Sequence, residues 1–249
     1  ISLSTTPVPN DISVLVVADP KVALTISAIK NLQDYIDGGG NLLFTGEPSK
    51  QDVLNPIIRQ FGVQLMDGAI VQQSKQLEPD LATPNLTGAA TKLFIPLERE
   101  HKDSVVVSMP LATALSIENI KGFQAQPLLV TNPKSSWLKR ERFLNDSAAV
   151  KFEPEKGDLQ RPFPLATSLT RKFNQKEQRI IIIGDADLMS NKELNRFNLR
   201  TANFAFNIGV FSWLSYGEFP ISSFRPAPKD TVLLVDKDQI HLLKLIFVW

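Results

Sequence analysis

Acidic and amide side chains follow four segments that the sequence predicts to be strands. Asp19 follows DISVLVVA, Glu47 follows NLLFTG, Asn132 follows QPLLVT, and Asp185 and Asp187 follow RIIIIG. In an open parallel sheet, the ligand crevice lies beyond the carboxyl ends of the strands. These side chains therefore predict an acidic mouth that suits a cation, a sugar or a basic partner.

Asp185 and Asp187 form the sharpest pair in this set. An Asp-x-Asp after a hydrophobic strand is where Mg²⁺-dependent phosphoryl enzymes place carboxylate ligands. No third ligand and no nucleophile motif stands beside the pair in the sequence, so we predict no metal site. The ordinary interpretation is capping, in which an Asp or Asn after a strand accepts the first free backbone N–H groups of the next helix.

Nucleophilic catalysis has few candidate residues. The chain contains no cysteine, which excludes thiolate nucleophiles, thiolate metal ligands and disulfides. Ser135 follows the QPLLVT strand, but no G-x-S-x-G elbow surrounds it. His101 and His241 are the only imidazoles, and neither has metal-ligand spacing to another donor. We therefore expect no catalytic residue and no cofactor, and we keep Ser135 only as a ligand-binding candidate.

The elements that would position these residues alternate between strands and helices in the first part of the chain. The β-branched run from Asp11 to Asp19 predicts a central strand buried on both faces. A helical stripe from Leu24 to Ile36, the apolar strand 41–45 and a second stripe from Val53 to Phe61 follow. Strand, helix, strand and helix at this spacing indicate an α/β fold with a mostly parallel sheet and helices on both faces.

The pattern changes in the middle and returns near the end. Residues 62–116 contain short extended pieces, which predict an inserted or edge segment with antiparallel pairing. Residues 134–143 could begin a helix capped by Ser135 or Ser136. Residues 179–184 form the most hydrophobic strand, and residues 201–214 form a nearly all-apolar helix that should be buried on most sides.

Composition limits the class of partner. Lys plus Arg and Asp plus Glu nearly cancel, leaving a net charge of +1 over 249 residues. No long basic block is present, and the electrostatic footprint of a nucleic-acid-binding domain is therefore missing. The length favours one domain with an elaborate insertion.

The last residues become steadily more apolar. Residues 237–249 read KDQIHLLKLIFVW, which is too short to cross a bilayer because a spanning helix needs about 20 apolar residues. The segment is either a terminal element that packs on the core or the start of a truncated transmembrane or juxtamembrane helix. We therefore expect one α/β domain over 1–236 and a separate tail over 237–249.

Several segments together resemble the ABC-type uncharacterised transport-system family, which includes the GldG-type gliding-motility auxiliary proteins. The resemblance runs in order over most of the chain and is carried by PNDISVLVVADPK (9–21), NLQDYIDGGGNLLFTGEP (31–48), QPLLVTNPKSSWL (126–138), RIIIIGDADLMSN (179–191), FNIGVFSWLS (206–215) and FRPAPKD (224–230).

The resemblance implies both a fold and a setting. It implies a flavodoxin-like fold of the class I glutamine amidotransferase type, on the periplasmic side of the bacterial inner membrane. The implied partners are ABC-2 permease and ATPase subunits and a paired auxiliary protein, with a flanking helix in the membrane. The family contributes no catalytic residues, and its GDADLMSN segment, which ends at Asn191, is either a ligand contact or a strand-to-helix turn.

Two functions stay open on this basis. The first is a non-catalytic extracytoplasmic interaction or ligand-binding domain of an ABC-2 transporter. The alternative is a small-molecule protein, such as a carbohydrate-binding protein, or a carboxylate-based enzyme that uses the acidic strand-end crevice.

Overall fold

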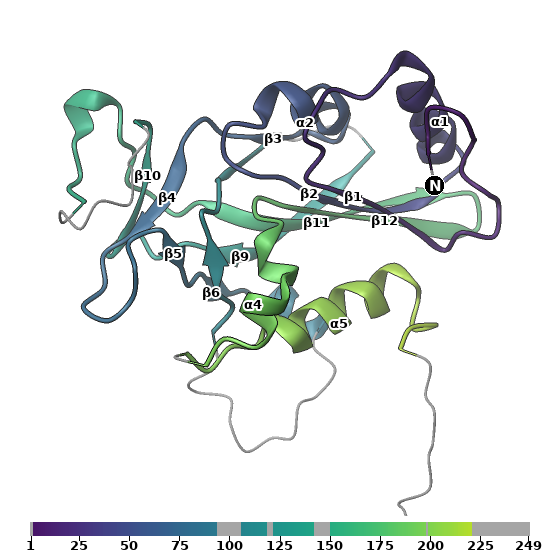
Figure 1. Ribbon diagram of the computed structural model, residues 1–249. Helices are drawn as coiled ribbons and strands as arrows, with labels where there is room; N and C mark the ends of the chain where they lie inside the picture. The colour runs from purple at the N-terminus through teal and green to yellow at the C-terminus, as the bar shows by residue number, and fades with distance from the viewer. Residues whose placement is uncertain (1, 94–105, 119–121, 142–149, 198, 221–249) are drawn as a thin grey trace, which may run out of the picture.

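A six-stranded mixed sheet with helices on both faces organises the chain. The computed structural model describes residues 2–93, 106–118, 122–141, 150–197 and 199–220 (Figure 1). The strands of the sheet lie in the order β1, β2, β12, β11, β9, β6. Their bounds are Val14–Ala18, Asn41–Thr45, Lys176–Ile183, Pro164–Phe173, Gln124–Val130 and Asn85–Leu86, in that order. The α/β class predicted from the sequence is confirmed, with a sheet that is mixed.

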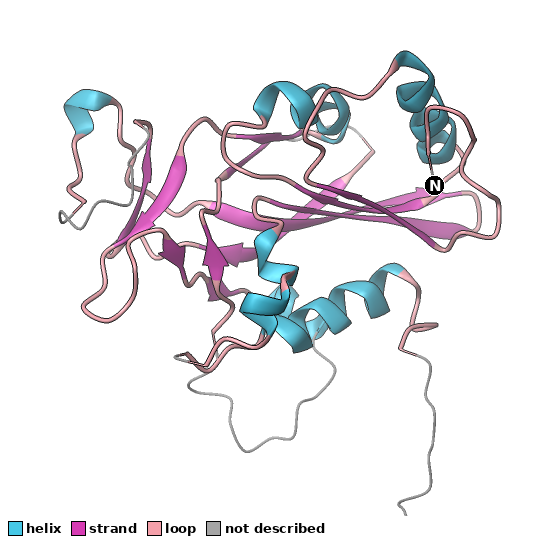
Figure 2. Cartoon of the chain, in the orientation of Figure 1, coloured by secondary structure: helices cyan, strands magenta, loops and turns pink. Residues whose placement is uncertain are grey.

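Helices cover the two faces of this sheet separately. Figure 2 shows helices both above and below the sheet. The upper pair is α1 (Ile26–Asp37) and α2 (Gln51–Ile58), and the lower helices include α4 (Asn191–Leu194) and α5 (Asn203–Leu214). α3 (Gly88–Leu93) contacts β9 and α5.

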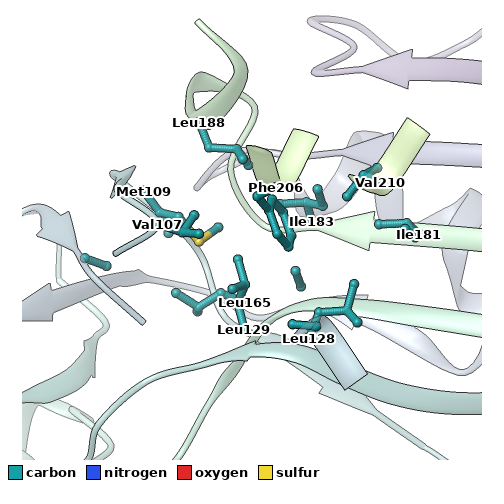
Figure 3. Close-up of a cluster of buried hydrophobic side chains, with 14 of the residues drawn as sticks. Val107, Met109, Leu128, Leu129, Leu165, Ile181, Ile183, Leu188, Phe206 and Val210 are labelled. Carbon is teal, nitrogen blue, oxygen red and sulfur yellow. The ribbon is translucent and has the colours of Figure 1, made fainter. Parts of the chain in front are cut away.

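Alternation along the central strands divides the core into two clusters. Leu42, Phe44, Ile180 and Ile182 pack in one cluster with the buried residues of α1 and α2. Leu43, Ile181 and Ile183 pack in the other with Phe206, Val210 and Leu214 of α5, as Figure 3 shows for several of them. Because successive side chains of a strand point to opposite faces, a continuous apolar run serves both clusters.

Strand direction differs from the prediction at the far side of the sheet. β1, β2 and β12 are parallel, as the alternating pattern predicts. β11 runs antiparallel to both β12 and β9, and β6 runs antiparallel to β9. The carboxyl end of β9 therefore lies at the same edge as those of β1, β2 and β12, but β11 separates it from them.

The position predicted for the first strand is wrong. β1 pairs only with β2 among the described residues, so it lies at an edge of the sheet. Val16 is 40% exposed, whereas all five residues of β2 are buried. The apolar residues of β1 therefore pack against both clusters, but the edge position leaves Val16 exposed.

The middle of the chain forms short antiparallel pairs. They are β3 with β8, β4 with β10, and β5 with β7. Their bounds are Val63–Leu65, Leu115–Ile117, Ala69–Gln72, Ser136–Lys139, Leu81–Ala82 and Met109–Pro110, in that order.

The helix predicted to begin near residue 134 is wrong. Ser136 to Lys139 form β10, and Trp137 lies opposite Val71 of β4. All four residues of this strand are buried, so pairing and burial on both sides outweigh the capping preference of the two serines. Trp137 is 4% exposed and its ring lies 6.1 Å from that of Phe152, so it is a core residue.

α5 is fully buried where it faces the core and partly buried over most of its remaining surface. Phe206, Val210 and Leu214 are fully buried, whereas Phe204 on the same helix is 63% exposed. The prediction that this helix is buried on most sides therefore holds for its core-facing positions and is wrong for Phe204.

Candidate functional site

The carboxyl ends of β1, β2 and β12 bring four acidic residues to one edge of the sheet. Asp19 N donates to Thr45 O at 2.9 Å, and Gly46 N donates to Ile183 O at 2.9 Å, so the chain segments after the three strands lie side by side. We call Asp19, Glu47, Asp185 and Asp187 the carboxyl-edge cluster.

Asp185 is the buried member of this cluster. Its Oδ1 accepts hydrogen bonds from Asp187 N at 2.7 Å and Leu188 N at 3.3 Å, which is the capping role described above. The residue is fully buried, and its Oδ2 has no hydrogen-bond partner among the described residues. Desolvation and then the nearby charge of Glu47 raise the pKa of Asp185 well above its usual range.

The Glu47 side chain, which follows β2, forms a hydrogen bond with the turn that follows β12. Its Oε1 accepts a hydrogen bond from Ala186 N at 2.7 Å. Burial, and then the charges of Asp187 and Asp19, raise the pKa of Glu47 to about 7, although the bond from Ala186 opposes that change. Glu47 and Asp185 are therefore two interacting carboxyls, and burial in the same turn region raises the pKa of both.

Asp19 lies on a sharp turn directly after β1. Its φ is 37°, in the left-handed region, which Asp tolerates better than most residues do. Asp19 Oδ2 forms an ion pair with Lys21, and Asp19 Oδ1 is buried without a hydrogen-bond partner in the described part of the chain. The Lys21 side chain is 74% exposed, whereas that of Asp19 is 13% exposed.

Two residues of this site were not among the ligand-binding candidates chosen from the sequence. Lys21 is one, and its position two residues after Asp19 in the sequence could have indicated their ion pair. Thr45 is the other. Its buried hydroxyl has no hydrogen-bond partner among the described residues, and in the sheet Thr45 pairs with Ala18 of β1 and with Ile183 of β12. Asp187 is exposed at the start of the short turn Asp187–Met189 and faces solvent.

Three predicted candidates do not join the cluster. Asn132 follows β9 beyond the intervening β11, and its Oδ1 accepts from Lys134 N at 3.0 Å. The backbone of Ser135 is bonded on both sides, to Asn132 O and from Gln73 N, so this serine belongs to the turn before β10. Asn191 is exposed at the start of α4, and in the described part of the chain no side-chain hydrogen bond joins it to the carboxylates.

The close approach of two loops fixes the turn that carries Asp185. Thr113 N donates to Gly184 O at 2.8 Å, and a Cβ at position 184 would lie 2.1 Å from Thr113 O. Only glycine fits there without a backbone shift, so Gly184 holds the entry to the DADLMSN segment against the loop before β8.

Two cavities lie near the ends of the sheet. One of about 260 Å³ is lined by Pro48 and Ser49, which follow Glu47 in the sequence, and by Lys139 and Arg140, but by none of the four carboxylates. A larger one of about 840 Å³ lies at the opposite edge, around residues 7–13 and 38–41, and none of the four carboxylates lines it. The carboxyl-edge cluster is therefore a candidate site because of its position and its buried polar atoms, and not because of the size of a cavity.

No group of three His, Asp or Glu side chains in the described residues is placed to hold a metal ion. His101 and His241 lie outside those residues, as does the predicted tail 237–249. Within the described segments, no helix is both long enough and apolar enough to cross a membrane.

Comparison with known proteins assigns the family. The model of the family described as "ABC-type uncharacterized transport system" matches residues 1–209. The chain belongs to this family. This membership makes it an auxiliary component of an ABC-type transport system, and it suggests a non-enzymatic role and transporter partners. Among curated proteins, none matches the chain.

Two solved structures superpose on this chain to different extents. The N-terminal domain of mmIFT52 superposes with a TM-score of 0.58 at 18% identity, over 84% of this chain and 80% of that one. A putative ThuA-like protein from Bacteroides uniformis ATCC 8492 superposes with a TM-score of 0.39 at 13% identity, over 81% of this chain and 69% of that one. At such identities the first likeness concerns the fold alone.

Proposed function

We propose that this chain is a non-catalytic extracytoplasmic interaction domain of an ABC-2 type transporter, and that the carboxyl-edge cluster is its contact site. The domain lies on the periplasmic side of the bacterial inner membrane. It binds the permease or a paired auxiliary protein, in a complex that includes the ATPase. The observation that carries the proposal is the family match over residues 1–209.

The fold supports this placement of the site. β1, β2 and β12 are parallel with helices on both faces, which is the arrangement of the flavodoxin-like fold that we propose for the domain. In such sheets the binding edge is the one at the carboxyl ends of the strands. The cluster lies at that edge, and one of its members, Asp187, is exposed to solvent and therefore accessible to a partner.

The test replaces three of the four carboxyls of the cluster by amides of the same shape. The triple variant Glu47→Gln, Asp185→Asn and Asp187→Asn keeps oxygen acceptors for the N–H groups of Ala186, Asp187 and Leu188. We expect it to fold, by circular dichroism, and to co-purify with less permease and ATPase from native membranes than the unaltered protein does. Undiminished co-purification of these subunits, or their absence with the unaltered protein, would refute the proposal.

A second candidate function rests on Glu47. Its pKa of about 7 is the value that suits a general acid or base at neutral pH. A carbohydrate-binding protein or a carboxylate-based enzyme would use the same edge. A thermal-shift screen of sugars, nucleotides and divalent ions tests this candidate, because a ligand that binds only the folded state raises the melting temperature. No shift across the screen would exclude these ligands.

A further inference from the structure

We propose that the carboxyl-edge cluster binds a primary ammonium group, and that Lys21 of this chain occupies the cluster in the absence of ligand. This inference rests on the proposed contact site and names the chemistry that the site recognises. The ammonium belongs to a lysine of a partner protein or to a small amine.

The position of Lys21 is the first reason. Its ammonium forms an ion pair with Asp19, and the hydrogen bond with Asp19 and the charges of Asp19, Glu47 and Asp187 raise the pKa of Lys21. The cluster thus already attracts an ammonium group from its own chain. Lys50 Nζ donates a hydrogen bond to Lys21 O at 3.3 Å, which joins the segment after β1 to the start of α2.

Unpartnered acceptors are the second reason. Asp19 Oδ1, Thr45 Oγ1 and Asp185 Oδ2 are buried without hydrogen-bond partners in the described part of the chain, and their residues follow or end adjacent strands. Asp185 Oδ2 is an acceptor once its carboxyl has lost its proton, which a bound cation favours. A buried acceptor without a donor is destabilising. An ammonium carries three donors and no acceptor, so it matches a site where several buried oxygens lack a donor.

Lys21 satisfies this site only in part. It bonds to Asp19 Oδ2 and leaves the three buried oxygens without partners. Its side chain is 74% exposed, so water and salt weaken the pair. A ligand that reaches the buried acceptors can therefore displace Lys21, and removal of Lys21 should strengthen ligand binding.

The test is an NMR titration of the ¹⁵N-labelled chain, followed at the amides of Gly46 and Ala186. The probes are Nα-acetyl-lysine amide for a partner's lysine and glucosamine for a small amine, with Nα-acetyl-glutamine amide as the neutral control. We expect one or both amines to give saturable shifts, and the neutral probe to give none. Whichever amine binds identifies the source of the ammonium.

Matched variants test the role of Lys21. We expect Lys21→Met to lower the Kd of the binding amine by about threefold or more, because the site is no longer partly occupied. Lys30→Met is the control, since the Lys30 side chain is 73% exposed and pairs with Asp34 on α1 instead. Asp187→Asn should raise the Kd.

Two results would overturn the inference: no saturable shift with either amine, or an equal Kd for Lys21→Met and the unaltered chain. If neither amine binds while the triple variant still loses co-purification, the ammonium inference fails and the proposed function stands. If an amine binds while co-purification is unchanged, the reverse holds.

Discussion

Glu47→Gln should stabilise the protein above neutral pH and have little effect in acid. The pKa of Glu47 is about 7 in the folded chain against 4.5 for an unperturbed glutamate. The folded state therefore keeps the proton longer than the unfolded state does, and the free energy of unfolding falls as pH rises from about 4.5 to 7. At 1.36 kcal/mol per pH unit the difference is about 3.4 kcal/mol, which partial solvent exposure reduces to about 2 kcal/mol.

Glutamine removes this cost because it has no proton to lose and can still accept from Ala186 N. Between pH 4.5 and pH 8, we expect the difference in unfolding free energy between Glu47→Gln and the unaltered chain to change by about 2 kcal/mol in favour of the variant. Urea unfolding at half-unit steps of pH measures this difference. Glu155→Gln, at an exposed carboxylate, is the control and should show no such trend. Parallel stability curves for Glu47→Gln and the unaltered chain would refute the reasoning.

The remaining predictions concern the frame that holds the cluster. Gly184→Ala should destabilise the chain by about 2 kcal/mol or more, because its Cβ would lie 2.1 Å from Thr113 O; Gly88→Ala, with open space around it, should be within about 0.5 kcal/mol of the unaltered chain in the same urea experiment. Phe206→Ala should cost about 3–5 kcal/mol because the ring is fully buried. Phe204→Ala, 63% exposed on the same helix, should change the melting temperature little, and equal losses for the two would contradict the core as described.

Local patterns predicted most elements but not their neighbours in the sheet. NLLFT and RIIIIG are continuous apolar runs, and both are buried central strands. The run in β1 is apolar as well, but β1 lies at an edge of the sheet. Strand order is set by long-range pairing, which a single sequence does not reveal. The serines before Trp137 favour a helix cap locally, but the pairing of β10 with β4 decides the outcome.

The candidate site was predictable in the same partial way. The strand-end rule places Asp19, Glu47, Asp185 and Asp187 at one edge because β1, β2 and β12 are adjacent and parallel. The same rule includes Asn132, but the antiparallel β11 lies between β9 and β12. The complete burial of Asp185 and the bond from Ala186 to Glu47 depend on how two loops pack, and no spacing in the sequence indicates either.

Site-specific photo-crosslinking tests the proposed contact most directly. A photoreactive residue replaces Asp187 in the protein expressed in its native host, and the same residue replaces Glu155 as an exposed control. The proposed function predicts that position 187 crosslinks to a permease or auxiliary subunit of an ABC transporter and that position 155 does not. Equal crosslinking of these subunits at both positions, or none at 187, would contradict the role of the carboxyl-edge cluster.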